Sequence, residues 1–284
     1  MPLAGSATGS KVIGLVAGNG VLPRLFADAA RAKGYRVVAL AHEAEADGAL
    51  AAHVDVLEWV KLGQLGKIAK RLRAHGAHEV VMAGGIGRVR AFTQIRPDFG
   101  ALQVIAKVRS FRDDGLLRAI AAYLEGQGVR VVAPTELLPE ALAPEGHLAG
   151  PAPSKAQEAD IALGLEVALL LGQADVGQTV VVRHGHVLAL EALEGTDEAI
   201  RRGGKLGGPG ACVVKLAKPG QDTRFDLPAV GPKTLDVMEE SGAVLLAVEA
   251  GRSVVLDAAA FLAEAKRRGI TVVGVRVSRV SRGD

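Results

Sequence analysis

The sequence predicts an α/β protein of two domains, with a parallel sheet and crossover helices in the first half and a mixed α/β domain in the second. Through the first half, short β-branched runs alternate with longer helical patterns, which is typical of such a sheet. A proline-rich stretch at residues 134–154 then interrupts the pattern. The chain of 284 residues also exceeds what one hydrophobic core usually supports. We therefore predict domains at residues 1–146 and 147–284.

Five strands and their connecting helices are expected in the first domain. The strands are expected at residues 11–17, 35–40, 54–60, 79–85 and 129–134. The stretch "GNGVLPRLFADAARAKG" contains a glycine turn and then a helical pattern, which would join the first two strands. A further helix is predicted to begin at Asp113 or Asp114 and to end at Gly126 or Gly128.

The second domain is predicted to begin with a long helix. Ser154, followed three residues later by Gln157, forms a capping-box pattern before the apolar run "IALGLEVALLL". The runs "TVVV" and "VLALEAL" around "RHGH" predict a hairpin, and "ACVVKLA" predicts a third strand, so these strands look antiparallel. Further strands are expected in "GAVLLAVEA", "SVVLD" and "ITVVGV", with a helix at about residues 257–268.

Charge and cysteine content limit the class of protein. Lys and Arg outnumber Asp and Glu by 34 to 31, an excess too small to argue for nucleic acid. The single cysteine, Cys212, lies in an apolar run and lacks a disulfide partner, so we expect a core residue in a cytoplasmic protein. The chain lacks an apolar run long enough to span a membrane. The basic tail from Arg276 suits either solvent or an anionic membrane surface.

Two glycine loops follow predicted strands of the first domain. In "GLVAGNGVLP", Gly18, Asn19 and Gly20 precede a helix, and in "MAGGIGRVRAF" Gly85 and Arg88 follow a strand. Since ligands bind outside the carboxyl ends of parallel strands, we expect the two loops to meet there and to contact substrate. A proline replaces the third glycine of the dinucleotide fingerprint, so a nucleotide or anion contact and a structural turn both stay open, with NAD the weakest alternative.

The second domain contains two acidic loops. Asp222 and Asp226 lie in "KPGQDTRFDLPAVGPKT", and Glu191 and Asp197 lie in "EALEGTDEAIRRGGK". Carboxylates that converge from separate loops are the usual ligands of Mg²⁺ or Mn²⁺. A solvated loop is the alternative explanation of the first set, and Asp197 could instead cap a helix.

Cations accompany these acids along the sequence. They are Lys215, Lys218, Arg224 and Lys233. A diphosphate would be repelled by carboxylates unless a divalent cation lay between them, while Lys and Arg cover the remaining oxygens. The residues thus indicate metal-assisted phosphoryl chemistry.

The combination of "EGTD" with "QDTRFDLPAVG" resembles the LpxI type of UDP-2,3-diacylglucosamine diphosphatase, an enzyme family of lipid A biosynthesis, and "GLVAGNGVLP", "AGGIGR" and "DDGLL" extend the likeness over nearly the whole chain. The resemblance implies a Rossmann-like first domain, an α/β second domain and a lipid held between them. It also implies Mg²⁺-dependent attack of water on the α-phosphate, which gives UMP and 2,3-diacylglucosamine 1-phosphate. The essential acid would be Asp226, with Asp222, Glu191 and Asp197 as metal ligands or their supports.

Two other functions stay open from the sequence alone. The glycine loop permits an NAD-dependent oxidoreductase, and a groove expected between the domains permits a non-catalytic lipid or nucleotide carrier. The expected partner is a lipid-linked UDP-sugar, while the sequence leaves undecided both homodimer formation and contact with the cytoplasmic face of the inner membrane.

Overall fold

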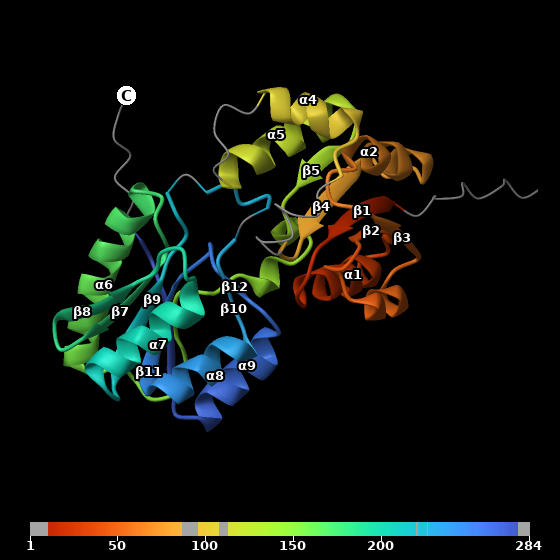
Figure 1. The fold of residues 1–284 in the computed structure, drawn as a ribbon. Helices are drawn as coiled ribbons and strands as arrows, with labels where there is room; N and C mark the ends of the chain where they lie inside the picture. The colour runs from red at the N-terminus through yellow and green to blue at the C-terminus, as the bar shows by residue number, and fades with distance from the viewer. Residues whose placement is uncertain (1–10, 87–95, 108–112, 220, 226, 278–284) are drawn as a thin grey trace, which may run out of the picture. The chain divides into compact units, whose positions relative to one another are not determined.

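The protein is described by a computed structural model that covers residues 11–86, 96–107, 113–219, 221–225 and 227–277 (Figure 1). The chain divides into two compact units, Met1–Leu138 (unit 1) and Pro139–Asp284 (unit 2). The division lies inside the proline-rich stretch, whereas the sequence placed the boundary after residue 146. Each unit is described by itself below.

Unit 1 contains a parallel five-stranded sheet in the order β3-β2-β1-β4-β5. Its strands are β1 (Val12–Ala17), β2 (Arg36–His42), β3 (Val56–Val60), β4 (Glu79–Ala83) and β5 (Arg130–Val132). All five lie where the β-branched runs predicted them. The connection after β1 leads to one side of the sheet and the connection after β4 leads to the other. Open α/β sheets bind ligands at the carboxyl ends of two such strands.

Helices cover both faces of this sheet. They are α1 (Leu22–Ala32), α2 (Leu65–Ala74), α4 (Phe99–Lys107) and α5 (Asp113–Gly126). In Figure 1, α1 lies on one side of the sheet and α2, α4 and α5 on the other. The α2 side packs closely on β1, since a Cβ at Gly14 would lie 2.5 Å from Leu72 Cδ2. The predicted bounds of α5 are confirmed.

The proline-rich stretch is structured. It forms short 3-10 turns at Pro134–Glu136 and Pro139–Ala141 and then strand β6 (Gly146–Ala149), which pairs antiparallel with β13. The sequence predicted a linker here. The strand escaped prediction because proline argues only against a central strand, and β6 lies at the edge of its sheet.

Unit 2 contains a six-stranded sheet in the order β6-β13-β11-β9-β7-β8. Its other strands are β7 (Thr179–Arg183), β8 (His186–Leu190), β9 (Ala211–Lys215), β11 (Ala243–Glu249) and β13 (Thr271–Val275). The β7–β8 hairpin is antiparallel as predicted, and β9 pairs antiparallel with β7, which is also as predicted. On its other side β9 pairs parallel with β11, and β11 pairs parallel with β13. The helices between these strands are the crossovers that parallel pairing requires. A separate two-stranded ladder joins β10 (Ala229–Val230) and β12 (Val254–Val255).

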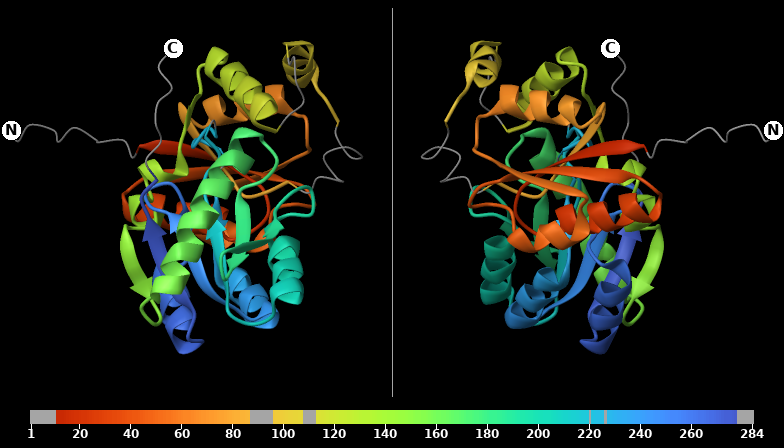
Figure 2. Two further views of the ribbon diagram at one scale, coloured as in Figure 1. Left: turned by 90° about the vertical axis from the view of Figure 1, so that its left-hand side faces the viewer. Right: turned by 90° about the vertical axis from the view of Figure 1, so that its right-hand side faces the viewer.

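Two hydrophobic cores lie on the two faces of the unit 2 sheet. The helices are α6 (Lys155–Gln173), α7 (Thr196–Gly207), α8 (Pro232–Ser241) and α9 (Ala258–Arg267). Ile200, Met238 and Phe261 from α7, α8 and α9 share one core, while α6 packs on the opposite face (Figure 2). The predicted capping box begins α6, because Ser154 and Gln157 bond each other's backbone N–H. No helix of the described residues is long and apolar enough to cross a membrane.

Candidate functional site

The predicted acids and cations of unit 2 gather at one edge of its sheet, which we call the carboxyl edge. The parallel strands β9 and β11 end there at Lys215 and Glu249. Thr179, at the start of antiparallel β7, pairs with Lys215, and Glu191 follows the end of β8 at the same level. The carboxyl ends of parallel strands are where α/β sheets carry their ligands.

Glu191 is buried beside the start of α7. Its Oε1 accepts a hydrogen bond from the Thr196 hydroxyl at 3.1 Å, and its Oε2 lies 3.4 Å from the backbone nitrogen of Gln178. The hydroxyls of Thr196 and Thr179 are 3.3 Å apart. The carboxylate therefore joins β7, β8 and α7 at the carboxyl edge.

Lys215 is also buried, at the end of β9. Its Nζ donates to the backbone oxygen of Ala229 in β10 at 3.0 Å. An ammonium is costly to remove from water unless it is hydrogen-bonded, so this contact stabilises the buried cation. Since β10 leads directly into α8, this hydrogen bond connects the end of β9 to the strand that precedes α8.

The first turns of α7 and α8 are joined by an ion pair. Lys233 Nζ lies 2.7 Å from Asp197 Oδ2. Asp197 is not the N-cap, which was one alternative from the sequence, because α7 begins at Thr196 with Gly195 as its N-cap. The carboxylate nevertheless lies in the first turn, where the helix dipole favours negative charge.

Asp222 and Arg224 form a bidentate pair. Arg224 Nη2 lies 2.8 Å from Oδ2 and its Nε 3.0 Å from Oδ1 of Asp222. The Asp222 side chain is only 16% exposed, so this pair is partly withdrawn from water. The sequence predicted a metal ligand and an anion-binding cation at these two positions, and here they bind each other. Asp226 and Arg88 lie outside the described residues.

One buried acid at this edge escaped the sequence analysis. Glu249, at the end of β11, is 3% exposed, and its Oε2 accepts the backbone N–H of Ala217 at 2.9 Å. Arg252 Nε lies 3.7 Å from its other oxygen. The only signal in the sequence was an acid at the end of the apolar run "AVLLAV". That signal does not reveal which residues of neighbouring strands lie beside Glu249.

The described residues do not by themselves form a metal site. Within the described ranges, no three His, Cys, Asp or Glu side chains are grouped so as to hold a metal ion. The predicted ligands Asp222, Glu191 and Asp197 are engaged by Arg224, Thr196 and Lys233 respectively. Magnesium binding therefore stays a prediction that depends on Asp226.

The two glycine loops of unit 1 meet, as expected. The Asn19 N–H donates to the Gly85 oxygen at 2.8 Å, and the Gly85 N–H donates back to Asn19 at 3.1 Å. The Gly18 N–H donates to Ala83. These amides are engaged with backbone oxygens, so they are not directed at a phosphate in this structure. Gly20 has a φ of 90°, which favours glycine in the turn before α1.

Cys212 is not equipped for nucleophilic catalysis. It is fully buried, and burial together with the charge of Asp160 raises the pKa of its thiol to about 12. The thiolate is the reactive form of cysteine, so this residue is inert at neutral pH. The predicted core role is confirmed.

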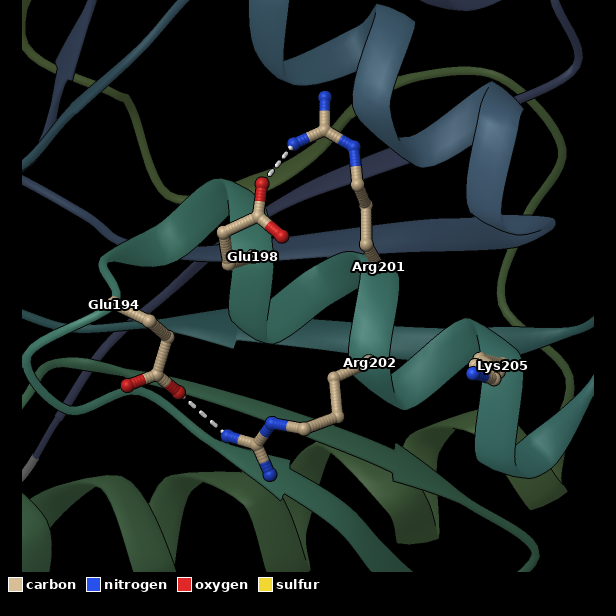
Figure 3. A pocket seen from close by; sticks show the side chains of 5 residues that line it. All are labelled: Glu194, Glu198, Arg201, Arg202 and Lys205. Atoms are coloured by element: carbon tan, nitrogen blue, oxygen red, sulfur yellow. Dashed lines mark hydrogen bonds and ion pairs between the residues drawn. The ribbon is translucent and has the colours of Figure 1, made fainter.

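An open depression of about 660 Å³ lies on the exposed side of α7 (Figure 3). Four of its lining residues form two ion pairs, Glu198 with Arg201 at 2.7 Å and Glu194 with Arg202 at 2.6 Å. Exposed ion pairs of this kind are typical of a solvated helix face. The depression is therefore not assigned to the site.

Comparisons with known proteins cover both units. The sequence model of the LpxI N-terminal domain matches residues 12–141, and that of the LpxI C-terminal domain matches residues 144–273. The chain is also 35% identical over 276 residues to a protein of Caulobacter vibrioides named UDP-2,3-diacylglucosamine pyrophosphatase LpxI. That alignment covers 93% of this chain and 97% of the relative.

Proposed function

The chain belongs to the LpxI family, and we propose from this premise that it hydrolyses UDP-2,3-diacylglucosamine to UMP and 2,3-diacylglucosamine 1-phosphate. The observation that carries the proposal is the 35% identity to the named pyrophosphatase over 93% of the chain. A similarity of this length spans both matched domains rather than one of them.

We place the bond cleavage at the α-phosphate. The water oxygen forms a bond to the α-phosphorus, the bond from that phosphorus to the bridging oxygen breaks, and the bridging oxygen leaves with the sugar phosphate. The proton of the attacking water passes to solvent or to an acidic side chain. Such a reaction mainly requires charge neutralisation and an oriented water, because no covalent enzyme intermediate is needed.

The cations at the carboxyl edge suit the charge of this substrate. Arg224 already forms a bidentate pair with a carboxylate, and the same fork geometry fits two phosphate oxygens. Lys215 supplies a buried positive charge, and the N-terminal ends of α7 and α8 add partial positive charge near Lys233. In our proposal these groups hold the diphosphate.

We further propose that hydrolysis requires Mg²⁺, or Mn²⁺ in its place, bound with Asp226 and one or more of Asp222, Glu191 and Asp197. Carboxylate oxygens are the ligand type that these ions prefer. A bound ion would neutralise the phosphate oxygens and lower the pKa of water. For Asp222 and Asp197, ligation would require exchange of their present partners, Arg224 and Lys233.

The proposal is tested with purified full-length protein and UDP-2,3-diacylglucosamine in detergent. We expect release of UMP with Mg²⁺ and its loss when EDTA removes the metal. In ¹⁸O-water the label should enter UMP, since attack is at the α-phosphorus. Intact substrate despite metal and detergent rejects the activity, while label in the sugar phosphate rejects only the position of attack.

The role of Asp226 is tested by Asp226→Asn. We expect hydrolysis to fall by a factor of about 100 or more, as for loss of one group that acts in the transition state. Asp236→Asn is the matched control, because Asp236 is an exposed acid of α8 that pairs with Arg268. A non-catalytic carrier would instead show no turnover by the parent protein, with equal ligand binding by the parent and Asp226→Asn.

The lipid substrate also implies a membrane contact. We propose a cytoplasmic protein that meets the cytoplasmic face of the inner membrane peripherally. Flotation with vesicles of phosphatidylglycerol and phosphatidylethanolamine tests this, and we expect more bound protein as the anionic fraction rises. An NAD-dependent activity has no support from the glycine loops, because their amides bond each other.

A further inference from the structure

The helix α4 of unit 1 has large apolar residues on its exposed side. Its stretch "FGALQVIA" contains no charged residue. Ala101 and Val104 are buried, and on the other side of the helix Phe99 is 76%, Leu102 52% and Ile105 38% exposed. We call the side formed by these three residues the apolar face. Surface helices normally carry polar or charged residues on their exposed side, so an apolar face is typical of an interaction surface.

Asp98 holds the start of α4 against α2. Its Oδ1 accepts the N–H of Ala101 at 3.0 Å, and its Oδ2 accepts the N–H of Lys67, in the first turn of α2, at 3.1 Å. A Cβ at Gly100 would lie 2.8 Å from the backbone nitrogen of Gly66, so the first turns of the two helices are in direct contact. The apolar face therefore begins beside α2 (Figure 1).

The exposed side of α2 is cationic. This helix contains four basic residues and no acid, and all four basic residues are exposed: Lys67, Lys70, Arg71 and Arg73. Arg71 pairs with Glu58 of β3. Within the part of the chain that the structure describes, the other three form no ion pair. An uncompensated positive surface thus lies next to the apolar face.

We propose that this surface binds an anionic lipid membrane, with the apolar face of α4 among the acyl chains and the cations of α2 beside the lipid phosphates. Apolar residues next to Lys and Arg are the combination that holds interfacial helices on such membranes. A second copy bound at the same face by two-fold symmetry would bring two sets of like charges together. The inference rests on the membrane contact of the proposed function and names the surface that forms it.

Trp59 provides a matched control on the other face of the unit 1 sheet. Its neighbour Glu58 contacts Arg71 and His75 of α2. Successive residues of a strand point to opposite faces, so Trp59 points to the face that α1 covers. Trp59 is 40% exposed, which is close to the 38% of Ile105. It therefore tests whether any exposed apolar side chain has the same effect.

The test is flotation of the full-length protein with vesicles of phosphatidylglycerol and phosphatidylethanolamine that contain no substrate. We expect the parent protein to float with the vesicles. The double variant Phe99→Ser/Leu102→Ser should bind about tenfold more weakly or less, because two apolar side chains no longer leave water. Trp59→Ser should bind like the parent. All three positions are exposed, so these substitutions leave the core intact.

The cations are tested one at a time. Lys70→Gln should weaken binding to the anionic vesicles roughly fivefold, since each basic residue near such a surface adds to the attraction. Arg24→Gln is the control, because Arg24 is an exposed cation of α1. The difference between the two variants should disappear at high salt, where exposed charges are screened. Equal binding by the two variants at low salt overturns the role of α2.

Insertion is measured independently by fluorescence. Trp59 is the only tryptophan of the chain, so Trp59→Phe combined with Phe99→Trp gives a protein whose single tryptophan lies on the apolar face. On addition of vesicles, its emission should shift to shorter wavelength and should be quenched by lipids with brominated acyl chains. Emission that neither shifts nor is quenched overturns insertion of α4.

The remaining outcomes are equally decisive. Absence of flotation by the parent, or equal flotation of the parent and Phe99→Ser/Leu102→Ser, overturns the proposal. A parent dimer that this variant converts to a monomer, with vesicle binding unchanged, assigns the apolar face to a second copy instead. Flotation without hydrolysis of the lipid substrate in detergent upholds the surface and rejects the proposed function, and hydrolysis without flotation does the reverse.

Discussion

At the residue scale, two of the predicted acids of unit 2 form ion pairs with two of the predicted cations. Asp222 pairs with Arg224 and Asp197 with Lys233. An anionic substrate that draws an arginine or lysine toward itself would release a carboxylate in the same step. Under the proposed function, these pairs would therefore link phosphate binding to the release of carboxylates for a metal ion.

The Asp222–Arg224 pair should contribute to both stability and activity. We expect Asp222→Asn to lower the free energy of unfolding by about 1 kcal/mol, since the variant keeps the size of the side chain but loses the charge-assisted bidentate contact. Urea denaturation measures this, and kcat/KM for UDP-2,3-diacylglucosamine should fall as well. Asp175→Asn is the control, because Asp175 forms a more exposed pair with Lys218 and should change stability little. Equal effects of the two substitutions would contradict the prediction.

Gly18 should tolerate no side chain. A Cβ there would lie 2.3 Å from a backbone oxygen of the β4 loop, which cannot move aside like a flexible side chain. We expect Gly18→Ala to lower the free energy of unfolding by about 1–3 kcal/mol, the usual cost of overpacking. Gly48→Ala is the matched control, because a Cβ at Gly48 would meet no atom within 4 Å. The same stability for both variants, measured by chemical denaturation, would disprove the close contact.

At the element scale, β3 and α2 are joined by a charged cluster. Glu58 of β3 lies 2.6 Å from Arg71 Nε and 2.7 Å from His75 Nε2 of α2. The hydrogen bond from Arg71, and more weakly that from His75, lower the pKa of Glu58 from 4.5 to about 2, although desolvation opposes them. The cluster fixes a crossover helix of the parallel sheet to the neighbouring strand.

This cluster predicts a pH dependence of stability. Because the pKa of Glu58 is lower in the folded protein, its stabilising contribution is fully present above pH 4.5 and is lost as the pH falls toward about 2. The free energy of unfolding should therefore fall more steeply between these pH values for the parent than for Glu58→Gln. Glu79→Gln, which removes a more exposed pair with Arg130, should keep the parent slope. Parallel curves for the parent and Glu58→Gln would refute this.

At the scale of the whole molecule, each unit has its own buried core. Phe26, Leu40 and Leu72 are fully buried in unit 1, and Leu235 and Phe261 in unit 2. Separate cores are what allow parts of a chain to unfold as independent units. The two matched family domains follow the same division.

Calorimetry should therefore resolve two unfolding transitions. We expect Gly18→Ala to lower the temperature of one and Phe261→Ala that of the other, since the removal of a buried phenylalanine costs about 3–5 kcal/mol in its own core. One common transition that both substitutions shift equally would show that the units unfold together.

The local patterns of the chain determined most of the fold. Alternating β-branched and helical runs predicted all strands of unit 1, and the Ser154 capping box predicted the start of α6, because these features depend on neighbours in sequence. Motif resemblance identified the family for the same reason. The edge strand β6 and the parallel pairing of β9 with β11 could not be predicted, because strand pairing depends on distant segments.

The sequence by itself also indicated most of the acids and cations of the candidate site, because their residue types and spacing are typical of sites that bind metal ions and phosphates. Only the tertiary structure decided which of them meet. It paired Asp222 with Arg224 and Asp197 with Lys233, and it brought Glu249 to the carboxyl edge and Glu45 to the end of β1. Contacts between residues far apart in the chain arise from strand order and from the burial of charge, and neither can be read from a local stretch.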